Sequence, residues 1–212
     1  RMGDGKMVDI MVYDGLYEIF YGYHMGITAE NIAEKYGISR LEQDELGALS
    51  HARAIQAIRA GLFTDEIVPV TIPQKKGEPV LFDTDERPME TSAQKMARLR
   101  PAFKKDGTVT AGNASGINDA AACLLLMSKD RAEQLGVPVL ARVKGHASAG
   151  LDPAYMGLGP IPAVRKLMDR QGMSMADFDR IELNEAFAAQ AIACARELGA
   201  DMEKTNTAGY GI

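Results

Sequence analysis

An asparagine, two cysteines and three histidines are the side chains in this sequence with the most evident chemistry. Asn184 follows the short apolar run 181–183, which predicts a buried strand. It precedes the alanine-rich run 185–198, which predicts a helix stopped by Gly199. In open α/β sheets, ligands gather at the carboxyl ends of strands. A carboxamide there can hold a water or polarise a carbonyl, but it can equally cap the helix, and the local sequence leaves both readings open.

Neither cysteine is expected to act as a nucleophile. Cys123 and Cys194 both lie in runs of alanine, leucine and isoleucine. An apolar setting raises the pKa of a thiol and keeps it unreactive, so both are predicted to be core residues. Two cysteines so far apart indicate no disulfide framework, and we expect a reducing, cytoplasmic setting.

The three histidines do not predict a metal site. His24, His51 and His146 have no histidine or cysteine partner at the spacing of metal ligands, so no metal is expected. His51 falls inside a predicted helix and is interpreted as structural. His24 lies among tyrosines and glycines just before a predicted helix, which suits either a pocket residue or an ordinary partly exposed histidine.

Composition excludes several function classes. The 212 residues carry 24 Lys and Arg against 29 Asp and Glu, and this net charge of −5 argues against a nucleic-acid partner. No apolar run approaches the roughly 20 residues that span a bilayer, so no membrane association is expected. Walker A, Gly-x-Ser-x-Gly and complete Gly-x-Gly-x-x-Gly motifs are all missing from the sequence, which leaves nucleotide hydrolysis and dinucleotide binding without support.

The elements that must position these groups follow an α/β order in the second half of the chain. From residue 120 the pattern predicts strand 120–127, helix 128–135, strand 139–146, helix 160–170, strand 181–183 and helix 185–198. Continuous apolar runs such as 120–127 are typical of strands buried on both faces. We therefore expect a largely covered sheet.

The first 110 residues predict a different, helix-rich segment with a small hairpin. Thr28 is expected to cap a helix to Tyr36, and a capping box at 39–42 to open a long helix to Ala60. Strands are predicted at 67–72, 80–82 and 108–110, and a short helix at 91–99. One face of the long helix is expected to be buried through its apolar residues, which are Leu41, Leu46, Leu49, Ala52, Ile55 and Ile58.

Two glycine-containing loops could approach a ligand closely. In the loop 111–119, Gly112 and Gly116 let the backbone come near, while Asn113 and Ser115 offer hydrogen bonds. A plain tight connection is the alternative for this loop. The loop 155–160 has a similar character.

Five stretches taken together resemble the thiolases, most closely the biosynthetic acetyl-CoA acetyltransferases. They occur in order over essentially the whole chain, at 21–31, 99–103, 107–116, 156–162 and 184–188. The resemblance implies an α/β fold of two similar halves with five-stranded sheets and a helix-rich loop domain inserted into the first. Residues 1–112 would form the loop domain that covers coenzyme A, 113–136 the end of the N-terminal half, and 137–212 the first part of the C-terminal half.

The resemblance also implies an activity. It is Claisen condensation of two acetyl-CoA to acetoacetyl-CoA and the reverse thiolysis, through an acyl-cysteine intermediate. The implied partners are acetyl-CoA, acetoacetyl-CoA and coenzyme A, with no cofactor beyond these thioester substrates, and a homotetramer or homodimer when complete. A non-catalytic acyl-CoA or lipid-binding module of the same fold is the alternative.

Residue roles follow from the same resemblance. Asn184 would be catalytic and hold the water of an oxyanion hole. Lys95 departs from the family pattern, which usually has a small residue there, and would be placed to meet a phosphate. The implied substrate-binding residues are His24, Met25, Lys95, Phe103, Ala111, Ser115, Met156, Ala186 and Phe187. Where family members place an arginine near the adenine, this chain has Pro88 with Arg87 beside it.

The catalytic groups of the family find no match in this chain. The nucleophilic cysteine of the family would fall before residue 1, and the Gly-His-Pro histidine and second cysteine after residue 212. Cys123 and Cys194 match neither position. The chain therefore resembles an internal fragment, and we predict that it is inactive alone.

Overall fold

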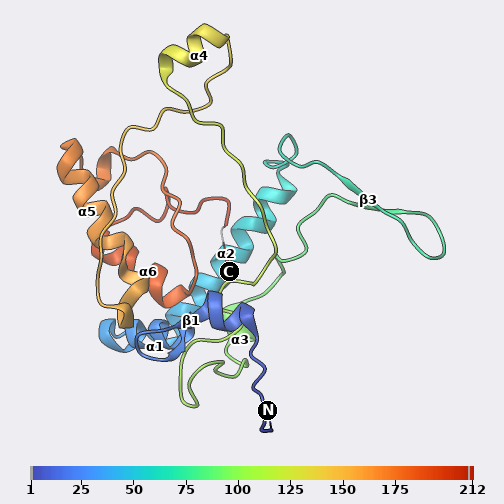
Figure 1. Ribbon diagram of the computed structural model, residues 1–212, viewed down its shortest axis with the longest axis vertical. Helices are drawn as coiled ribbons and strands as arrows, with labels where there is room; N and C mark the ends of the chain where they lie inside the picture. Colours follow the sequence, from blue (N-terminus) through green and yellow to red (C-terminus); the bar gives the residue numbers. More distant parts are fainter. Residues whose placement is uncertain (1, 210) are drawn as a thin grey trace.

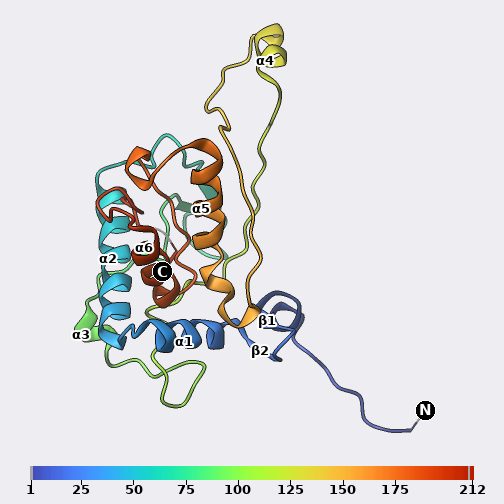
Figure 2. The same cartoon turned by 90° about the vertical axis from the view of Figure 1, so that its left-hand side faces the viewer.

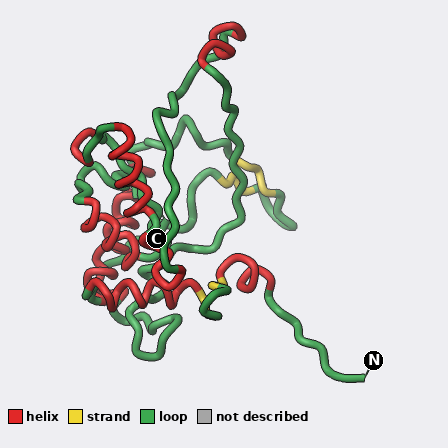
Figure 3. The backbone as a smooth tube through the Cα atoms, turned by 60° about the vertical axis from the view of Figure 1, so that its left-hand side comes forward, coloured by secondary structure: helices red, strands yellow, loops and turns green. Residues whose placement is uncertain are grey.

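The computed structural model describes residues 2–209, 211 and 212; Tyr210, in the glycine-containing run near the end, lies outside the described residues. Most helices gather in one body, from which the N-terminal segment, a hairpin and a long arm project (Figures 1 and 2). The tube view shows how much of the chain outside that body is loop (Figure 3). No helix in the described part is long and apolar enough to cross a membrane.

Six α-helices carry the architecture of the described residues. They are α1 (Met25–Tyr36), α2 (Arg40–Arg59), α3 (Ala93–Met96), α4 (Lys129–Leu135), α5 (Pro160–Gln171) and α6 (Ala188–Leu198). A π-helix, η1 (Met11–Leu16), and two 3-10 helices, η2 (Pro153–Leu158) and η3 (Met175–Asp177), connect them. Strands β1 (Tyr17–Glu18) and β2 (Tyr23–His24) form one antiparallel pair. Strands β3 (Val70–Ile72) and β4 (Val80–Phe82) form another, with Thr71 opposite Leu81.

Helix boundaries follow local sequence chemistry closely. The predicted capping box is confirmed at α2, where the backbone N–H of Ser39 donates to Glu42 Oε2 at 2.7 Å and that of Glu42 donates to Ser39 Oγ at 3.2 Å. Glycines in the left-handed conformation end α1, α4, α5 and α6, at Gly37, Gly136, Gly172 and Gly199.

The predicted cap of α1 is wrong. His24, not Thr28, precedes the helix, and its Nδ1 accepts a hydrogen bond from the backbone N–H of Gly26 at 2.9 Å. The Thr28 hydroxyl instead donates to the carbonyl of Met25 at 2.6 Å, inside the first turn. A ring nitrogen can satisfy an orphan N–H as a hydroxyl would, so the helix begins four residues earlier than predicted.

Helix α6 is the centre of the body and contacts α1, α2, α5 and η2 (Figure 2). Its alanines are buried, and small side chains let the neighbouring helices approach closely. The main apolar cluster around it consists of Ile32, Ala33, Ile38, Leu158, Ile161, Ala189, Ala193 and Cys194.

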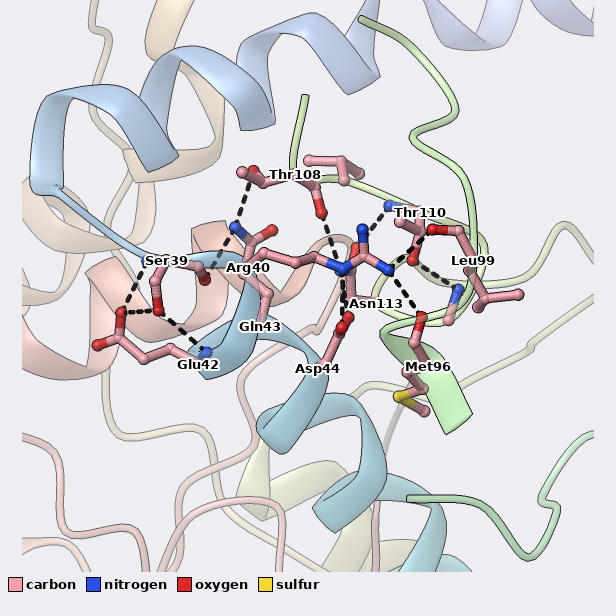
Figure 4. Close-up of polar contacts among 12 residues, drawn as sticks. Ser39, Arg40, Glu42, Gln43, Asp44, Met96, Leu99, Thr108, Thr110 and Asn113 are labelled. Carbon is pink, nitrogen blue, oxygen red and sulfur yellow. Dashed lines mark hydrogen bonds and ion pairs between the residues drawn. The ribbon is translucent and has the colours of Figure 1, made fainter. Parts of the chain in front are cut away.

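The predicted buried face of α2 is wrong. Leu41 and Leu49 are 58% and 40% exposed, whereas the helix buries Gln43, Asp44 and Ser50. Buried polar groups need partners, and each of these side chains has at least one, although Gln43 Oε1 has none in the described part of the chain. Asp44 Oδ2 pairs with Arg40 Nε at 2.7 Å, and Gln43 Nε2 donates to Thr108 Oγ1 at 2.9 Å (Figure 4).

Several predicted strands do not form among the described residues. Residues 120–127 and 139–146 are extended loop, with Leu125 83% and Leu140 99% exposed. A strand requires a hydrogen-bonded neighbour, and these segments have none among residues 2–209, 211 and 212. Residues 108–110 and 181–183 likewise lie outside the two described sheets.

Cys123 lies on the same extended arm and is exposed, so its prediction as a core residue is also wrong. The prediction depended on strand 120–127 being covered on both faces. Cys194, by contrast, is fully buried in α6, and its prediction is confirmed.

Candidate functional site

An apolar cavity of about 210 Å³ lies where α1, η2 and the chain leading into α6 meet. Its lining consists of Met25, Thr28, Ala29, Ile32, Met156, Gly157, Pro160, Leu183, Asn184, Ala186, Phe187 and Gln190. Ligand sites are typically concave and apolar with a few polar groups, and drug-sized ligands need roughly 300 Å³ or more. This cavity therefore suits a small apolar group.

One wall of the cavity is held by contacts between α1 and η2. Asn31 Nδ2 donates to the carbonyl of Ala154 at 3.1 Å and to the hydroxyl of Tyr23 at 3.3 Å. A Cβ on Gly157 would lie 2.8 Å from Gln190 Cγ and 3.0 Å from Ile32 Cδ1. Glycine at 157 is therefore what lets η2, and Met156 with it, approach α1 and α6.

Asn184 does not cap α6, which corrects one of its two open readings. The helix begins at Ala188 with Phe187 as its N-cap, and no side chain caps it. Residues 184–187 form a loop held by main-chain bonds: Ser115 N–H donates to Ala186 O at 3.0 Å, and Ala188 N–H to Asn113 O at 2.9 Å. The loop 113–115 thus fixes one edge of the segment that carries Asn184.

The carboxamide of Asn184 is available to a ligand. Asn184 is exposed and lines the cavity, and its side chain has no hydrogen-bond partner among the described residues. An amide offers two donors and an acceptor. At this position it can hold a water or contact a polar atom of a group seated in the cavity.

Three aromatic rings adjoin the cavity. His24 stacks on Phe103 with ring centroids 4.5 Å apart, and Phe103 meets Phe187 edge-on at 6.1 Å. A Cβ on Gly26 would overlap the ring of Phe103, so the contact requires glycine there. Burial lowers the pKa of His24, because desolvation disfavours the imidazolium. Since Nδ1 accepts from Gly26, the neutral ring presents its proton on Nε2.

The structure gathers some of the predicted site residues and leaves others apart. Met25, Met156, Asn184, Ala186 and Phe187 line the cavity. His24 and Phe103 adjoin it through the ring contacts, and Ser115 through its bond to Ala186.

Two predicted residues lie elsewhere. Lys95 and Ala111 are exposed and do not line the cavity. Lys95 Nζ donates to the carbonyl of Glu90 at 3.3 Å, so the ammonium is held beside the start of α3.

Gln190 is a cavity residue that the sequence analysis missed. It is 5% exposed, and its Oε1 has no hydrogen-bond partner in the described part of the chain. It follows Leu183 and Phe187 at seven and three residues, a helical spacing that could have identified it once Phe187 was singled out.

Neither cysteine belongs to the site. Burial raises the pKa of Cys194 to about 11, and its thiol donates to the carbonyl of Gly157 at 3.3 Å, behind the cavity lining. Cys123 is on the projecting arm. No group of three or more His, Cys, Asp or Glu side chains in residues 2–209, 211 and 212 could hold a metal ion.

Arg87 reaches the loop that borders the site. Its Nη2 donates to the carbonyl of Ala114 at 3.4 Å, and a Cβ on Gly116 would overlap its guanidinium. A glycine at 116 therefore allows a cation to lie against this loop.

Comparison with known proteins identifies what the chain resembles. Two family profiles match it: the thiolase N-terminal domain over residues 1–130 and the thiolase C-terminal domain over residues 137–212. It is 56% identical over 213 residues to the acetyl-CoA acetyltransferase of Pseudomonas aeruginosa and 57% identical to that of Syntrophomonas wolfei. Each alignment covers 100% of this chain and 54% of the relative, so the chain spans about half the length of these curated relatives.

Solved structures agree with this result. The Bacillus anthracis acetyl-CoA acetyltransferase superposes with a TM-score of 0.91 at 47% identity, covering 100% of this chain and 53% of that one. Human mitochondrial 3-ketoacyl-CoA thiolase gives a TM-score of 0.89 at 36% identity, with the same two coverages. The backbone arrangement described above is thus that of about half of each of these proteins.

Proposed function

The chain belongs to the thiolase family, and from that premise we propose that it forms part of an acetyl-CoA C-acetyltransferase. The proposed reaction is the condensation of two acetyl-CoA to acetoacetyl-CoA and the reverse thiolysis, through an acyl-cysteine intermediate. Relatives named acetyl-CoA acetyltransferase support this choice of substrate. The expected α/β thiolase fold is confirmed by the solved structures.

The observation that carries the proposal is the unpartnered carboxamide of Asn184 beside a small apolar cavity. Met25, Met156 and Phe187 would hold the methyl end of an acetyl or acetoacetyl group. Asn184 would hold a water that donates a hydrogen bond to the thioester oxygen as negative charge develops on it. Removing one donor of this kind lowers kcat by roughly 10²- to 10³-fold in other enzymes.

Coenzyme A would approach the cavity past the aromatic rings. We place the pantetheine arm beside His24 and Phe103, where Nε2–H of the neutral imidazole can donate to an amide carbonyl. Ala111 and Ser115 would contact the same arm from the bordering loop. Lys95 and Arg87 are the cations proposed to meet its phosphates.

The proposal extends to the surroundings of the enzyme. The complete enzyme is proposed to be a homotetramer or homodimer in the cytoplasm, and its thioester substrates are proposed to need no further cofactor. Both cysteines of the chain are free thiols, which suits a reducing compartment.

The chain alone is predicted to be inactive, because neither of its cysteines can serve as the nucleophile at this cavity. The measurement is consumption of acetoacetyl-CoA and coenzyme A by the purified 212-residue chain. Turnover above the uncatalysed rate would contradict the prediction.

The role of Asn184 is tested in a test enzyme, defined as the Pseudomonas aeruginosa relative with its matching segment replaced by these 212 residues. Asn184→Ala is expected to lower kcat by about 10²-fold while changing coenzyme A affinity much less. Gln56→Ala, which removes another exposed carboxamide on α2, is the matched control and should keep full activity. A loss of affinity alone would refute the oxyanion role.

A second function has one observation in its favour. Because neither cysteine lines the cavity, the chain could serve as a non-catalytic module that binds acyl-CoA or lipid. Calorimetric titration of the 212-residue chain with acetyl-CoA tests this possibility. If the 212-residue chain binds acetyl-CoA and the test enzyme has no activity, the binding module is favoured over the transferase.

A further inference from the structure

Asn206 is a buried residue in a strained conformation next to the site. It is 3% exposed, and with φ of +49° it is the one non-glycine among the described residues that adopts positive φ. Its backbone N–H donates to the carbonyl of Ile181 at 3.0 Å, next to an isolated parallel β-bridge between Ile181 and Thr205. Asparagine tolerates this conformation better than most residues, but strain of this kind needs support from the surroundings.

The side chain of Asn206 clamps the segment that carries Asn184. Its Oδ1 accepts from the backbone N–H of Leu183 at 2.8 Å, and its Nδ2 donates to the carbonyl of Leu183 at 2.7 Å and to Glu185 Oε1 at 2.8 Å. Leu183 and Glu185 are the two neighbours of Asn184 in sequence. Both donors and one acceptor of the carboxamide are thus used to fix the residues on either side of it.

The clamp is tied to α2. Glu185 is 2% exposed, and its other carboxylate oxygen accepts from Ser50 Oγ at 2.6 Å. Arg53 Nη1 donates to the carbonyl of Thr205 at 2.8 Å, which holds the loop before Asn206 against the same helix. The loop 113–115 holds the opposite edge of the segment, so Asn184 is constrained from both sides.

From this geometry we propose that Asn206 is a positioning residue for the reaction, fixing the backbone at 183–185 so that the Asn184 carboxamide faces the cavity. The inference rests on the proposed function, because it matters only if Asn184 acts on the reacting thioester. A misplacement of about 1 Å can cost roughly 10²-fold in rate, so a clamp on both neighbours can control kcat without touching substrate.

The chemistry of the clamp requires an amide. Aspartate has the same shape and keeps the acceptor for the N–H of Leu183, but it has no donor for the carbonyl of Leu183. It would also place a carboxylate against that of Glu185. Asn206→Asp is therefore the smallest change that opens the clamp.

The experiment is a double-mutant cycle in the test enzyme. Asn206→Asp is expected to lower kcat by about tenfold or more, with KM changed less, and this effect should vanish in the Asn184→Ala background. Glu185→Gln combined with Asn206→Asp should recover part of the kcat, because the new amide can donate to the new carboxylate. Ser39→Ala removes the α2 cap and controls for lost stability; it should lower the melting temperature but not kcat.

The outcomes separate the two proposals. Full kcat in Asn184→Ala would overturn the oxyanion role, and this inference would fall with it. A reduced kcat in Asn184→Ala with full kcat in Asn206→Asp would overturn only the positioning role, as would equal losses from Asn206→Asp in both backgrounds. If Asn206→Asp does not fold, Asn206→Gly removes the clamp while accepting the positive φ, and the same expectations apply to it.

Discussion

Glu30 offers a sharp test of how the loop bordering the site is held. It lies on α1 and is 5% exposed. Its carboxylate accepts from the backbone N–H groups of Thr108 and Val109, each at 2.9 Å, and from the Thr108 hydroxyl at 3.0 Å. Gly107 must lack a side chain here, because a Cβ would overlap the carboxylate. This single anion therefore fixes the chain just before the loop 111–116.

The change to make is Glu30→Gln, which preserves shape but replaces one acceptor oxygen with a donor. The carbonyl oxygen left in the place of Oε1 can still accept from the N–H groups of Thr108 and Val109, but the new amide in the place of Oε2 cannot accept from the Thr108 hydroxyl or share its N–H. Hydrogen bonds to charged groups contribute about 1.5–3 kcal/mol each, against about 0.5–1.5 kcal/mol for neutral ones. Losing one bond and weakening another gives an expected loss of about 2–3 kcal/mol in the free energy of unfolding.

Urea unfolding of the 212-residue chain measures this loss. With a slope of about 2 kcal/mol per molar urea, the midpoint should fall by about 1 M. Glu34→Gln is the matched control on the same helix. Its carboxylate is 77% exposed and 3.7 Å from Lys104 Nζ, so the expected change is below about 0.5 kcal/mol. If both variants unfold at the same urea concentration, the assignment of Glu30 as the anchor is refuted.

Two further predictions concern titratable groups. Burial raises the pKa of Cys194 to about 11, whereas Cys123 is exposed. Iodoacetamide at about pH 8 should therefore alkylate Cys123 and spare Cys194 until the chain is unfolded. Equal labelling of the two thiols in a mass-spectrometric time course would argue against this prediction. The pKa of His51 is lowered mainly by burial and to a smaller extent by the positive charge of Arg87. The imidazole of His51 therefore binds a proton more strongly in the unfolded chain than in the folded one. Protonation of His51 does not reduce the free energy of unfolding above the unfolded pKa of about 6.5, but it does so increasingly as the pH falls below that value. In urea titrations between about pH 7.5 and 5, the wild type should therefore lose more stability than His51→Gln. Parallel losses in both proteins would contradict this prediction.

Local chemistry made much of the helical part predictable. The capping box at 39–42, the prolines that open α5 and the glycines that close helices act through residues a few positions apart, so they are readable in sequence. The thiolase resemblance, which depended on motifs in register, is confirmed by the family comparison. The roles assigned to individual site residues stay predictions.

Long-range partners decided what the sequence analysis got wrong. The buried face of α2 was predicted from its apolar residues, but Asp44 is buried because Arg40 and Asn113 pair with it. Apolar runs at 120–127 and 139–146 resemble buried strands, yet a strand is defined by a neighbour that the run itself does not contain.

The sequence by itself determined the family, the glycines that end helices, the capping box of α2 and the identity of Asn184 as a residue of interest. Only the tertiary structure decided that Asn184 is not a helix cap and that its carboxamide lies unpartnered at a cavity. The physical reason is that caps and stops arise within one turn of the chain. The position of Asn184, in contrast, depends on Ser115 and Asn206, which approach it from distant parts of the sequence and satisfy the backbone around it.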